Sequence, residues 1–267
     1  MPYLKRGDSG FEVRLLQKGL AIFGKNPNLS FDGSFGPSTE LALKRYQASK
    51  GLATTGVYDD PTQRQLGPDI AYKFIHYNEM DDFARDMKVM PAALKAVYDV
   101  ESKGDGFFAN GEPVILFEGH IFYKLYQQRY GTTKVREVAR MHPNICYPSW
   151  DRSKYYGGAR EHLRLANAVQ VHREIALQSA SWGLFQVMGF NYQAAGYDNI
   201  QAFINAMYES EHEQFFAGCS FIASNASMHR ALRDLNWREF ARRYNGPGYE
   251  ENNYHIKLAT AFNKHNR

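Results

Sequence analysis

A repeated helical pattern near the start of the chain constrains the fold more than any other feature of the sequence. Residues 4–20 and 32–52 each place apolar residues at helical spacing beside one glutamine, Gln17 in the first segment and Gln47, 30 positions later, in the second. The second helix is expected to carry four residues of apolar character: Leu41, Ala42, Leu43 and Tyr46. Two short helices of similar design therefore open the chain.

A third unit begins at Thr55-Gly56-Val57 and completes this N-terminal region. Its short helix is expected to run from Asp60 or Pro61 to about Leu66 and to end at Gly67-Pro68, because glycine and proline commonly close helices. Three short helices predict one compact domain. The predicted division of the chain is a first domain, a connector and a second domain, at residues 1–68, 69–80 and 81–267.

The second domain is expected to be largely helical, which makes the chain a mainly α protein. Helical periodicity returns after residue 80, and polar, aromatic-rich loops interrupt it. The long stretch 141–160 holds several aromatic residues and paired glycines, and long loops of this kind are often functional. The predicted helices are 91–101, 119–126, 161–178, 200–217 and 236–244, the last capped by Asn236.

Composition and charge exclude several classes of protein. Hydrophobic residues make up 44% of the 267 residues, so the chain can form a core and is not disordered. The net charge of +4 is too weak and too evenly spread for a nucleic-acid-binding protein. The N-terminus lacks the apolar run of a signal peptide, and no stretch approaches the ~20 apolar residues of a membrane span, so we expect no stable membrane insertion.

Cysteine and histidine patterns predict neither a metal site nor a cofactor. Cys146 and Cys219 are far apart and form no CxxC motif, so reduced, buried thiols are expected. The nine histidines include no HExxH motif and no pair at ligating helical spacing.

Glu101 is the candidate catalytic residue. Leu94, Val97, Tyr98 and Glu101 stand at positions i, i+3, i+4 and i+7 of one predicted helix, so the carboxyl group shares an otherwise apolar face. Burial disfavours the ionised form and raises the pKa of a carboxyl group, as a glycosidase acid requires. The alternative is a residue at the edge of the core that pairs with a cation.

Two turn motifs downstream are candidate substrate-binding segments. In residues 181–189, Gly183 permits close approach of the backbone and Gln186 can both donate and accept hydrogen bonds. The second motif, Tyr244-Asn245-Gly246, follows a predicted helix and could face a cleft. A tight buried turn and a helix stop are the respective alternatives. The candidate binding residues are Ser181, Gly183, Phe185, Gln186, Tyr192, Tyr244 and Asn245.

These motifs resemble known families. The N-terminal segment is similar to the peptidoglycan-binding repeat domain of wall hydrolases, through a pattern of glycine, glutamine and apolar residues that includes Gly7, Asp8, Leu16, Gln17, Asp32, Gly33, Phe35, Gly36, Tyr46, Gln47, Thr55 and Gly56. A glutamate at a helix end, a Gly-Leu-Phe-Gln-Val turn and a late Tyr-Asn-Gly stretch, in that order, resemble goose-type lysozymes and lytic transglycosylases. The blocks 99–102 and 114–122 look like the N-acetylmuramidase domain of modular phage endolysins.

The resemblance implies both a fold and a reaction. The fold would be a small three-helix peptidoglycan-binding domain plus a larger helical lysozyme-like domain. The reaction would be hydrolysis of the β-1,4 bond between N-acetylmuramic acid and N-acetylglucosamine, with Glu101 as the general acid. Glu118 is either a second carboxylate of the cleft, which stabilises the transition state or positions water, or a structural residue that forms a salt bridge or caps the next helix.

Three other functions stay open at the level of sequence. A lytic transglycosylase would use the same Glu101 and leave 1,6-anhydromuramic ends. The histidine pattern disfavours a zinc amidase or peptidase, and the retained Glu101 disfavours a non-catalytic wall-binding protein. As a monomeric endolysin, the protein would bind peptidoglycan and no nucleic acid. It would stay in the host cytoplasm until a holin opens the way, and would then act in the periplasm and cell wall to lyse the host.

Overall fold

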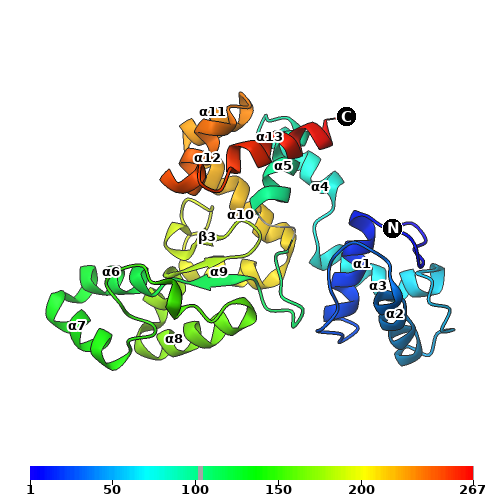
Figure 1. Cartoon of the computed structure of the whole chain (residues 1–267), viewed down its shortest axis with the longest axis horizontal. Helices are drawn as coiled ribbons and strands as arrows, with labels where there is room; N and C mark the ends of the chain where they lie inside the picture. The colour runs from blue at the N-terminus through cyan, green and yellow to red at the C-terminus, as the bar shows by residue number, and fades with distance from the viewer. Residues whose placement is uncertain (102–104, 267) are drawn as a thin grey trace. The chain divides into compact units, whose positions relative to one another are not determined.

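The computed structural model describes residues 1–101 and 105–266, so Ser102 of the 99–102 block lies outside the described residues. The chain divides into two compact units (Figure 1). The N-terminal unit comprises Met1–His76 with Phe107–Glu112, and the C-terminal unit comprises Tyr77–Gly106 with Pro113–Arg267. The expected mainly α architecture is confirmed, since helices dominate both units.

The N-terminal unit is built from α1 (Phe11–Ile22), α2 (Pro37–Ser49) and α3 (Asp60–Lys73). Its two repeated glutamines are buried and perform the same task. Gln17 Nε2 donates to Ser34 O at 3.0 Å and its Oε1 accepts from Gly33 N at 2.8 Å. Gln47 Nε2 donates to Val57 O at 2.9 Å and its Oε1 accepts from Gly56 N at 3.0 Å. Each glutamine therefore ties its helix to the backbone of the loop that follows.

The predicted end of the third helix is wrong. Instead of stopping at Gly67-Pro68, α3 continues to Lys73 with Pro68 inside it. Proline removes one helical hydrogen bond, but the next turn carries Ile70, which is fully buried in the core of this unit together with Phe74. Burial of these side chains outweighs the local signal to stop.

Because α3 continues to Lys73, much of the predicted connector is helical. Residues 69–80 hold the last turn of α3 and the start of α4 (Tyr77–Asp86), and the N-terminal unit reaches His76. As limits of functional domains, 1–68, 69–80 and 81–267 stay predictions. Of the four residues expected to give the second helix its apolar character, Leu43 is fully buried whereas Leu41 is 49% exposed.

The C-terminal unit combines helices with one small sheet. In chain order its elements are α4 (Tyr77–Asp86), α5 (Pro91–Glu101), β1 (Ile115–Phe117), α6 (Gly119–Tyr130), α7 (Thr132–Met141), η1 (Arg152–Lys154), η2 (Gly158–Arg160), α8 (Glu161–Gln178), β2 (Ala180–Trp182), β3 (Val187–Met188), η3 (Gly189–Asn191), α9 (Ile200–Glu209), α10 (Glu211–Ser224), α11 (Ala226–Arg233), α12 (Trp237–Asn245), η4 (Pro247–Tyr249) and α13 (Tyr254–His265).

Two groups of helices can be followed within this unit in Figure 1. In the first group, α5 packs against α4 and α13, and α12 packs against α11 and α13. In the second group, α8 packs against α6, α9 and the strands β1 and β2. The first group carries the end of α5 and the end of α12, and the second group supports the sheet.

The sheet joins segments that are distant in sequence. Its order is β1-β2-β3 and both pairs are antiparallel, with Leu116 opposite Ser181 and Ser181 opposite Met188. The Gly-Leu-Phe-Gln turn connects β2 to β3 as a tight hairpin. Because Glu118 directly follows β1, and its backbone N–H donates to Ser179 O at 2.9 Å, this residue is held beside the start of the hairpin.

The helix predictions for this unit have mixed outcomes. Helices α5 and α8 have the predicted bounds, and the Asn236 cap is confirmed, since its Oδ1 accepts from Glu239 N at 3.2 Å. The predicted helix 200–217 is wrong as a single helix, because α9 and α10 are separated at Ser210. The backbone of Ser210 is extended and its Oγ accepts from Glu213 N at 3.2 Å, so a serine cap starts a new helix there.

Candidate active site

Glu101 is the last residue of α5, and its carboxyl group is largely buried. Asn245 Nδ2, at the end of α12, donates to Glu101 Oε2 at 2.9 Å. Within the described part of the chain, neither Oε1 of Glu101 nor Oδ1 of Asn245 has a hydrogen-bond partner. Buried polar oxygens without a partner are rare in folded proteins, which marks this pair as a candidate site.

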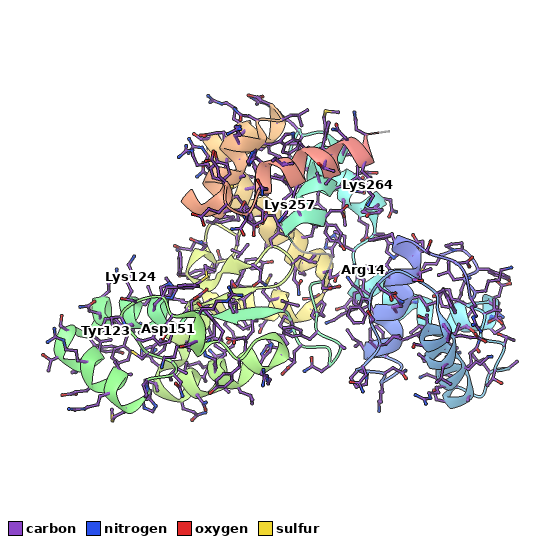
Figure 2. All side chains as sticks on the ribbon, viewed as in Figure 1. Arg14, Tyr123, Lys124, Asp151, Lys257 and Lys264 are labelled. Carbon is purple, nitrogen blue, oxygen red and sulfur yellow. The ribbon has the colours of Figure 1, made fainter. Side chains whose placement is uncertain are left out.

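The electrostatic surroundings of Glu101 favour its protonated form. Burial raises the pKa of the carboxyl from 4.5 to about 7, although the Asn245 hydrogen bond and the charge of Lys257 both lower it. Lys257 lies on α13, which packs against α5 (Figure 2). Glu101 also stands at the C-terminal end of its helix, where the helix dipole disfavours negative charge. The predicted pKa shift from burial is present.

The end of α12 connects Glu101 to the hairpin. Tyr244 Oη donates to Phe185 O at 2.7 Å, and the Tyr244 ring stacks on Phe240 with centroids 5.6 Å apart. Burial and the nearby Glu101 carboxylate raise the pKa of Tyr244 well above its ordinary value, so the hydroxyl stays protonated and can donate. Tyr244 and Asn245, which are neighbours in sequence, thus link the hairpin turn to Glu101 through two hydrogen bonds.

The hairpin turn uses its polar groups internally. Gln186 adopts a left-handed backbone with φ 49°. Its Nε2 donates to Gly183 O at 2.8 Å and to Val114 O at 3.2 Å, and its Oε1 accepts from Ser181 Oγ at 2.8 Å. Both amide hydrogens are thereby occupied, and Gln186 holds the shape of the turn and links it to the segment before β1.

Two further candidate residues lie in different surroundings. The Phe185 residue is 2% exposed and its ring packs edge-on against Phe215 with centroids 5.3 Å apart, so the ring belongs to the core. A Cβ at Gly218 would lie 2.3 Å from the Phe185 ring, which explains why a glycine faces it. Tyr192 is half-buried directly after η3, and within the described residues its side chain forms no hydrogen bond with Glu101.

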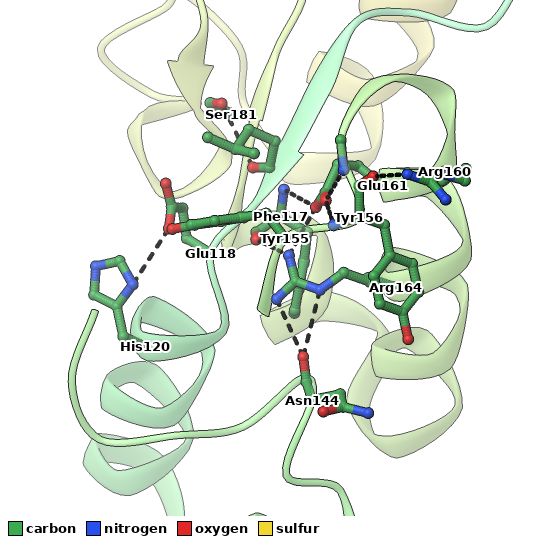
Figure 3. Close-up of polar contacts among 12 residues, drawn as sticks. Phe117, Glu118, His120, Asn144, Tyr155, Tyr156, Arg160, Glu161, Arg164 and Ser181 are labelled. Atoms are coloured by element: carbon green, nitrogen blue, oxygen red, sulfur yellow. Dashed lines mark hydrogen bonds and ion pairs between the residues drawn. The ribbon is translucent and has the colours of Figure 1, made fainter. Parts of the chain in front are cut away.

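Glu118 stands at the N-cap position of α6, but its side chain makes no capping hydrogen bond. Its Oε2 accepts a short hydrogen bond from Tyr155 Oη, and His120 Nδ1 lies 3.3 Å from the same oxygen (Figure 3). The Glu118 side chain is 16% exposed. Of the structural alternatives considered from sequence, the capping bond is absent, whereas a contact with the His120 ring lies where a salt bridge was expected.

A buried ion pair anchors the loop that carries Tyr155. Glu161 and Arg164 are fully buried, with Glu161 Oε2 2.7 Å from Arg164 Nη1. Glu161 Oε1 accepts from Tyr156 N at 2.6 Å, while Arg164 donates to Phe117 O at 2.7 Å and to Asn144 O at 3.1 Å (Figure 3). The pair therefore fastens both ends of the loop to β1, next to Glu118.

Sequence reasoning missed this ion pair, although a signal for it existed. Glu161, Arg164, Leu165 and Ala168 stand at positions i, i+3, i+4 and i+7 of the predicted helix 161–178 and are all buried. This is the same pattern that drew attention to Glu101. A charged pair of opposite sign on an apolar helical face indicates a buried salt bridge.

Other groups in the described residues add no metal chemistry. No group of three or more potential ligands is placed to hold a metal ion there. Both cysteines are free and buried as predicted, and burial raises the pKa of the Cys146 thiol to about 12. Among the described helices, none combines the length and apolar character needed to cross a bilayer.

Within the helical unit, the largely buried carboxyl of Glu101 is linked through the end of α12 to the hairpin of the small sheet. Residues 90–266 match the family model of N-acetylmuramidase, and the chain belongs to this family. Residues 9–66 match the model of a putative peptidoglycan binding domain. The modular organisation inferred from the sequence motifs is confirmed.

Similar proteins include one solved structure that spans the whole chain. It is the crystal structure of the Burkholderia AP3 phage endolysin, which is 36% identical, covers 100% of both chains and superposes with a TM-score of 0.69. Two curated relatives match over 64 residues only: the zinc D-Ala-D-Ala carboxypeptidase of Streptomyces albus G, 44% identical, and an N-acetylmuramoyl-L-alanine amidase of Bacillus licheniformis, 39% identical. The match covers 24% of this chain, and 25% and 18% of those two relatives.

Proposed function

We propose that this chain is an endolysin that hydrolyses the β-1,4 bond between N-acetylmuramic acid and N-acetylglucosamine in bacterial peptidoglycan. The observation that carries the proposal is the state of Glu101, whose buried carboxyl has its pKa raised to about 7 and retains one oxygen without a hydrogen-bond partner among the described residues. At neutral pH a large fraction of this group is protonated, so it can donate a proton to the glycosidic oxygen.

As Glu101 donates its proton to the glycosidic oxygen, the bond from that oxygen to the anomeric carbon of N-acetylmuramic acid breaks and N-acetylglucosamine leaves with a free hydroxyl. Water then adds to the oxocarbenium-like carbon and gives up a proton to a carboxylate. Glu118 is the second carboxylate of the proposed site, held by Tyr155 and His120. A carboxylate at this position would stabilise the developing positive charge or orient the water. The buried pair of Glu161 and Arg164 would keep Tyr155 in position for this role.

The substrate-binding residues are proposed with different roles. Asn245 Oδ1, which is buried and lacks a hydrogen-bond partner among the described residues, is proposed to accept from an N–H group of the acetamido substituents when the glycan binds. The turn of Gly183, Phe185 and Gln186 is proposed to contact the glycan by its surface, because its side chains are buried or internally bonded and Gly183 N–H and Phe185 O are already hydrogen-bonded. Ser181 and Tyr244 position that turn, and Tyr192 is proposed as a peripheral contact to the glycan.

The cellular role follows from the architecture. A monomeric enzyme of this kind would accumulate in the host cytoplasm, pass to the periplasm and cell wall when a holin opens the membrane, and cause lysis. The N-terminal unit would hold the catalytic unit at the wall and raise its local concentration there. The similarity of the whole chain to a phage endolysin supports this proposal.

The chemical products test the reaction directly. Purified peptidoglycan is digested with the full chain, reduced with borohydride and analysed by mass spectrometry, with Glu101→Gln as the control. Reducible muramic acid ends are expected. Anhydromuramic ends would reassign the chain as a lytic transglycosylase, and reducible glucosamine ends would move the cut to the other glycosidic bond. Freed stem peptides on an intact glycan would refute a glycosidase.

A further inference from the structure

A pocket of about 400 Å³ lies in the N-terminal unit, between α2 and the loop that follows α1. Four of its lining residues stand at positions i, i+3, i+4 and i+7 on one face of α2: Ser38, Leu41, Ala42 and Arg45. The loop supplies the rest of the lining with residues 25–29. We propose that this pocket binds the free carboxylates of peptidoglycan stem peptides, an inference that rests on the proposed wall-binding function.

The pocket carries positive charge without an internal counter-charge. Lys25 and Arg45 are exposed, and within the described ranges neither forms an ion pair or hydrogen bond through its side chain. Other cations near α2 are neutralised, since Lys44 Nζ lies 2.6 Å and Arg6 Nη1 3.6 Å from the carboxylate of Glu40. No aspartate or glutamate lines the pocket. An anionic ligand is the complement of such a surface.

The loop wall of the pocket is pre-formed. Asn26 Nδ2 donates to Gly24 O at 2.7 Å and to Leu20 O at 3.1 Å, which ties the loop to the end of α1. Leu29 packs against the core of the unit from the other end of the loop. Lys25 is held in the left-handed region with φ 53°, a conformation that non-glycine residues rarely adopt. A rigid wall lowers the entropic cost of ligand binding.

The lining favours a peptide over a glycan strand. None of its residues is aromatic, whereas flat sugar faces are commonly held by aromatic rings. Leu41 is 49% exposed and lies beside buried Ala42, so the pocket offers an apolar surface that suits small methyl side chains. Ser38 lies in the first turn of α2, where the helix dipole adds to the attraction for a carboxylate.

Binding to sacculi tests the inference independently of catalysis. The full chain carrying Glu101→Gln is sedimented with purified sacculi, either intact or stripped of stem peptides by an amidase. Into this background we introduce Lys25→Gln with Arg45→Gln. The matched control is Lys5→Gln with Arg64→Gln, which removes two exposed cations of the same unit that do not line the pocket.

The pocket variant is expected to bind intact sacculi roughly tenfold more weakly, because two carboxylate contacts are lost. The control variant is expected to bind within about twofold of the parent, and stripping should reduce the parent to the level of the pocket variant. Equal binding by the two double variants would overturn the inference. So would undiminished binding of the parent to stripped glycan, which would make the ligand the glycan strand.

Two further measurements keep the result unambiguous. Arg45→Glu, compared with Arg64→Glu, repeats the test without altering the left-handed Lys25, and equal melting temperatures show that both variants fold. Digestion of the same sacculi by the chain with Glu101 intact reports on the proposed reaction separately. Absence of glycan cleavage together with pocket-dependent binding would contradict the proposed reaction and leave the binding site in place.

Discussion

Asn245 donates a hydrogen bond of 2.9 Å to Glu101, although 144 positions separate the two residues in sequence. The bond joins the last residue of α12 to the last residue of α5. It stabilises the ionised carboxylate, whereas burial stabilises the protonated form, and burial dominates because the pKa of Glu101 is raised to about 7. A carboxyl group whose pKa lies near neutral pH is well suited to donate a proton.

Replacement of Glu101 by glutamine should abolish catalysis while leaving wall binding intact. The amide keeps the size of the side chain but cannot donate the proton, so a loss of roughly 10²–10⁴-fold in kcat is expected. Release of soluble muropeptides measures the rate, and sedimentation with sacculi measures binding. Cleavage at more than a tenth of the original rate would remove Glu101 from the role of general acid.

The same substitution should change stability in a pH-dependent way. The folded-state pKa of Glu101 lies above its ordinary value, so the folded protein holds this proton more tightly and loses stability as pH rises from 4.5 towards 7. Glu101→Gln removes that penalty, so its advantage over the original protein should grow by up to about 3 kcal/mol between pH 4 and pH 8. Urea unfolding at both pH values measures it, and a constant difference would contradict the raised pKa.

Replacement of Asn245 by leucine should shift the alkaline limb of the pH–rate profile to higher pH. Loss of the hydrogen bond to the carboxylate raises the pKa of Glu101 further, by about one unit. The profile of kcat/KM against pH reports this pKa in the free enzyme. Asn252→Leu is the control, since Asn252 is exposed and its amide lies 3.4 Å from Gly248 O rather than near the carboxyl. Identical profiles for the two variants would exclude the Asn245 contact as a determinant.

Breaking the buried ion pair of Glu161 and Arg164 should lower the free energy of unfolding far more than breaking an exposed ion pair. Arg164→Met leaves Glu161 as a buried, unpaired charge and is expected to cost about 3–5 kcal/mol of unfolding free energy. Arg129→Met removes the partner of Glu174 in a half-exposed pair and is expected to change the unfolding free energy far less, because solvent screens exposed charges. Chemical denaturation compares the two variants, and similar losses would show that burial does not govern these pairs.

The hairpin turn should tolerate no side chain at Gly183. This glycine has φ 66°, and a Cβ there would lie 2.7 Å from the Gln214 side chain. Gly157 has a similar φ of 72° but open space around its Cβ position. Gly183→Ala should therefore lose more stability than the roughly 1 kcal/mol expected of Gly157→Ala, because strain and a clash add together. Thermal unfolding of both variants separates the effect of backbone strain, which both share, from that of the clash, which only Gly183→Ala adds.

Local sequence patterns predicted much of the helical framework. The repeat around Gln17 and Gln47, the bounds of α5 and α8 and the cap at Asn236 all depend on contacts a few residues apart or on periodic burial. The errors occurred where distant packing outweighed local signals. Helix α3 passes through Pro68 because Ile70 is buried against the core, and the break at Ser210 needed a cap that periodicity does not reveal.

The sequence by itself determined that Glu101 shares an apolar helical face and that a glycine-containing turn follows downstream. Only the tertiary structure decided what these residues can do. The pKa of Glu101 depends on burial, on Asn245 and on Lys257, which come from α12 and α13. Gln186, a candidate for hydrogen bonding to a ligand, is bonded to Val114 and Gly183 within the protein. Electrostatics and hydrogen bonding act through space, so positions far apart in the chain set the chemistry of one carboxyl group.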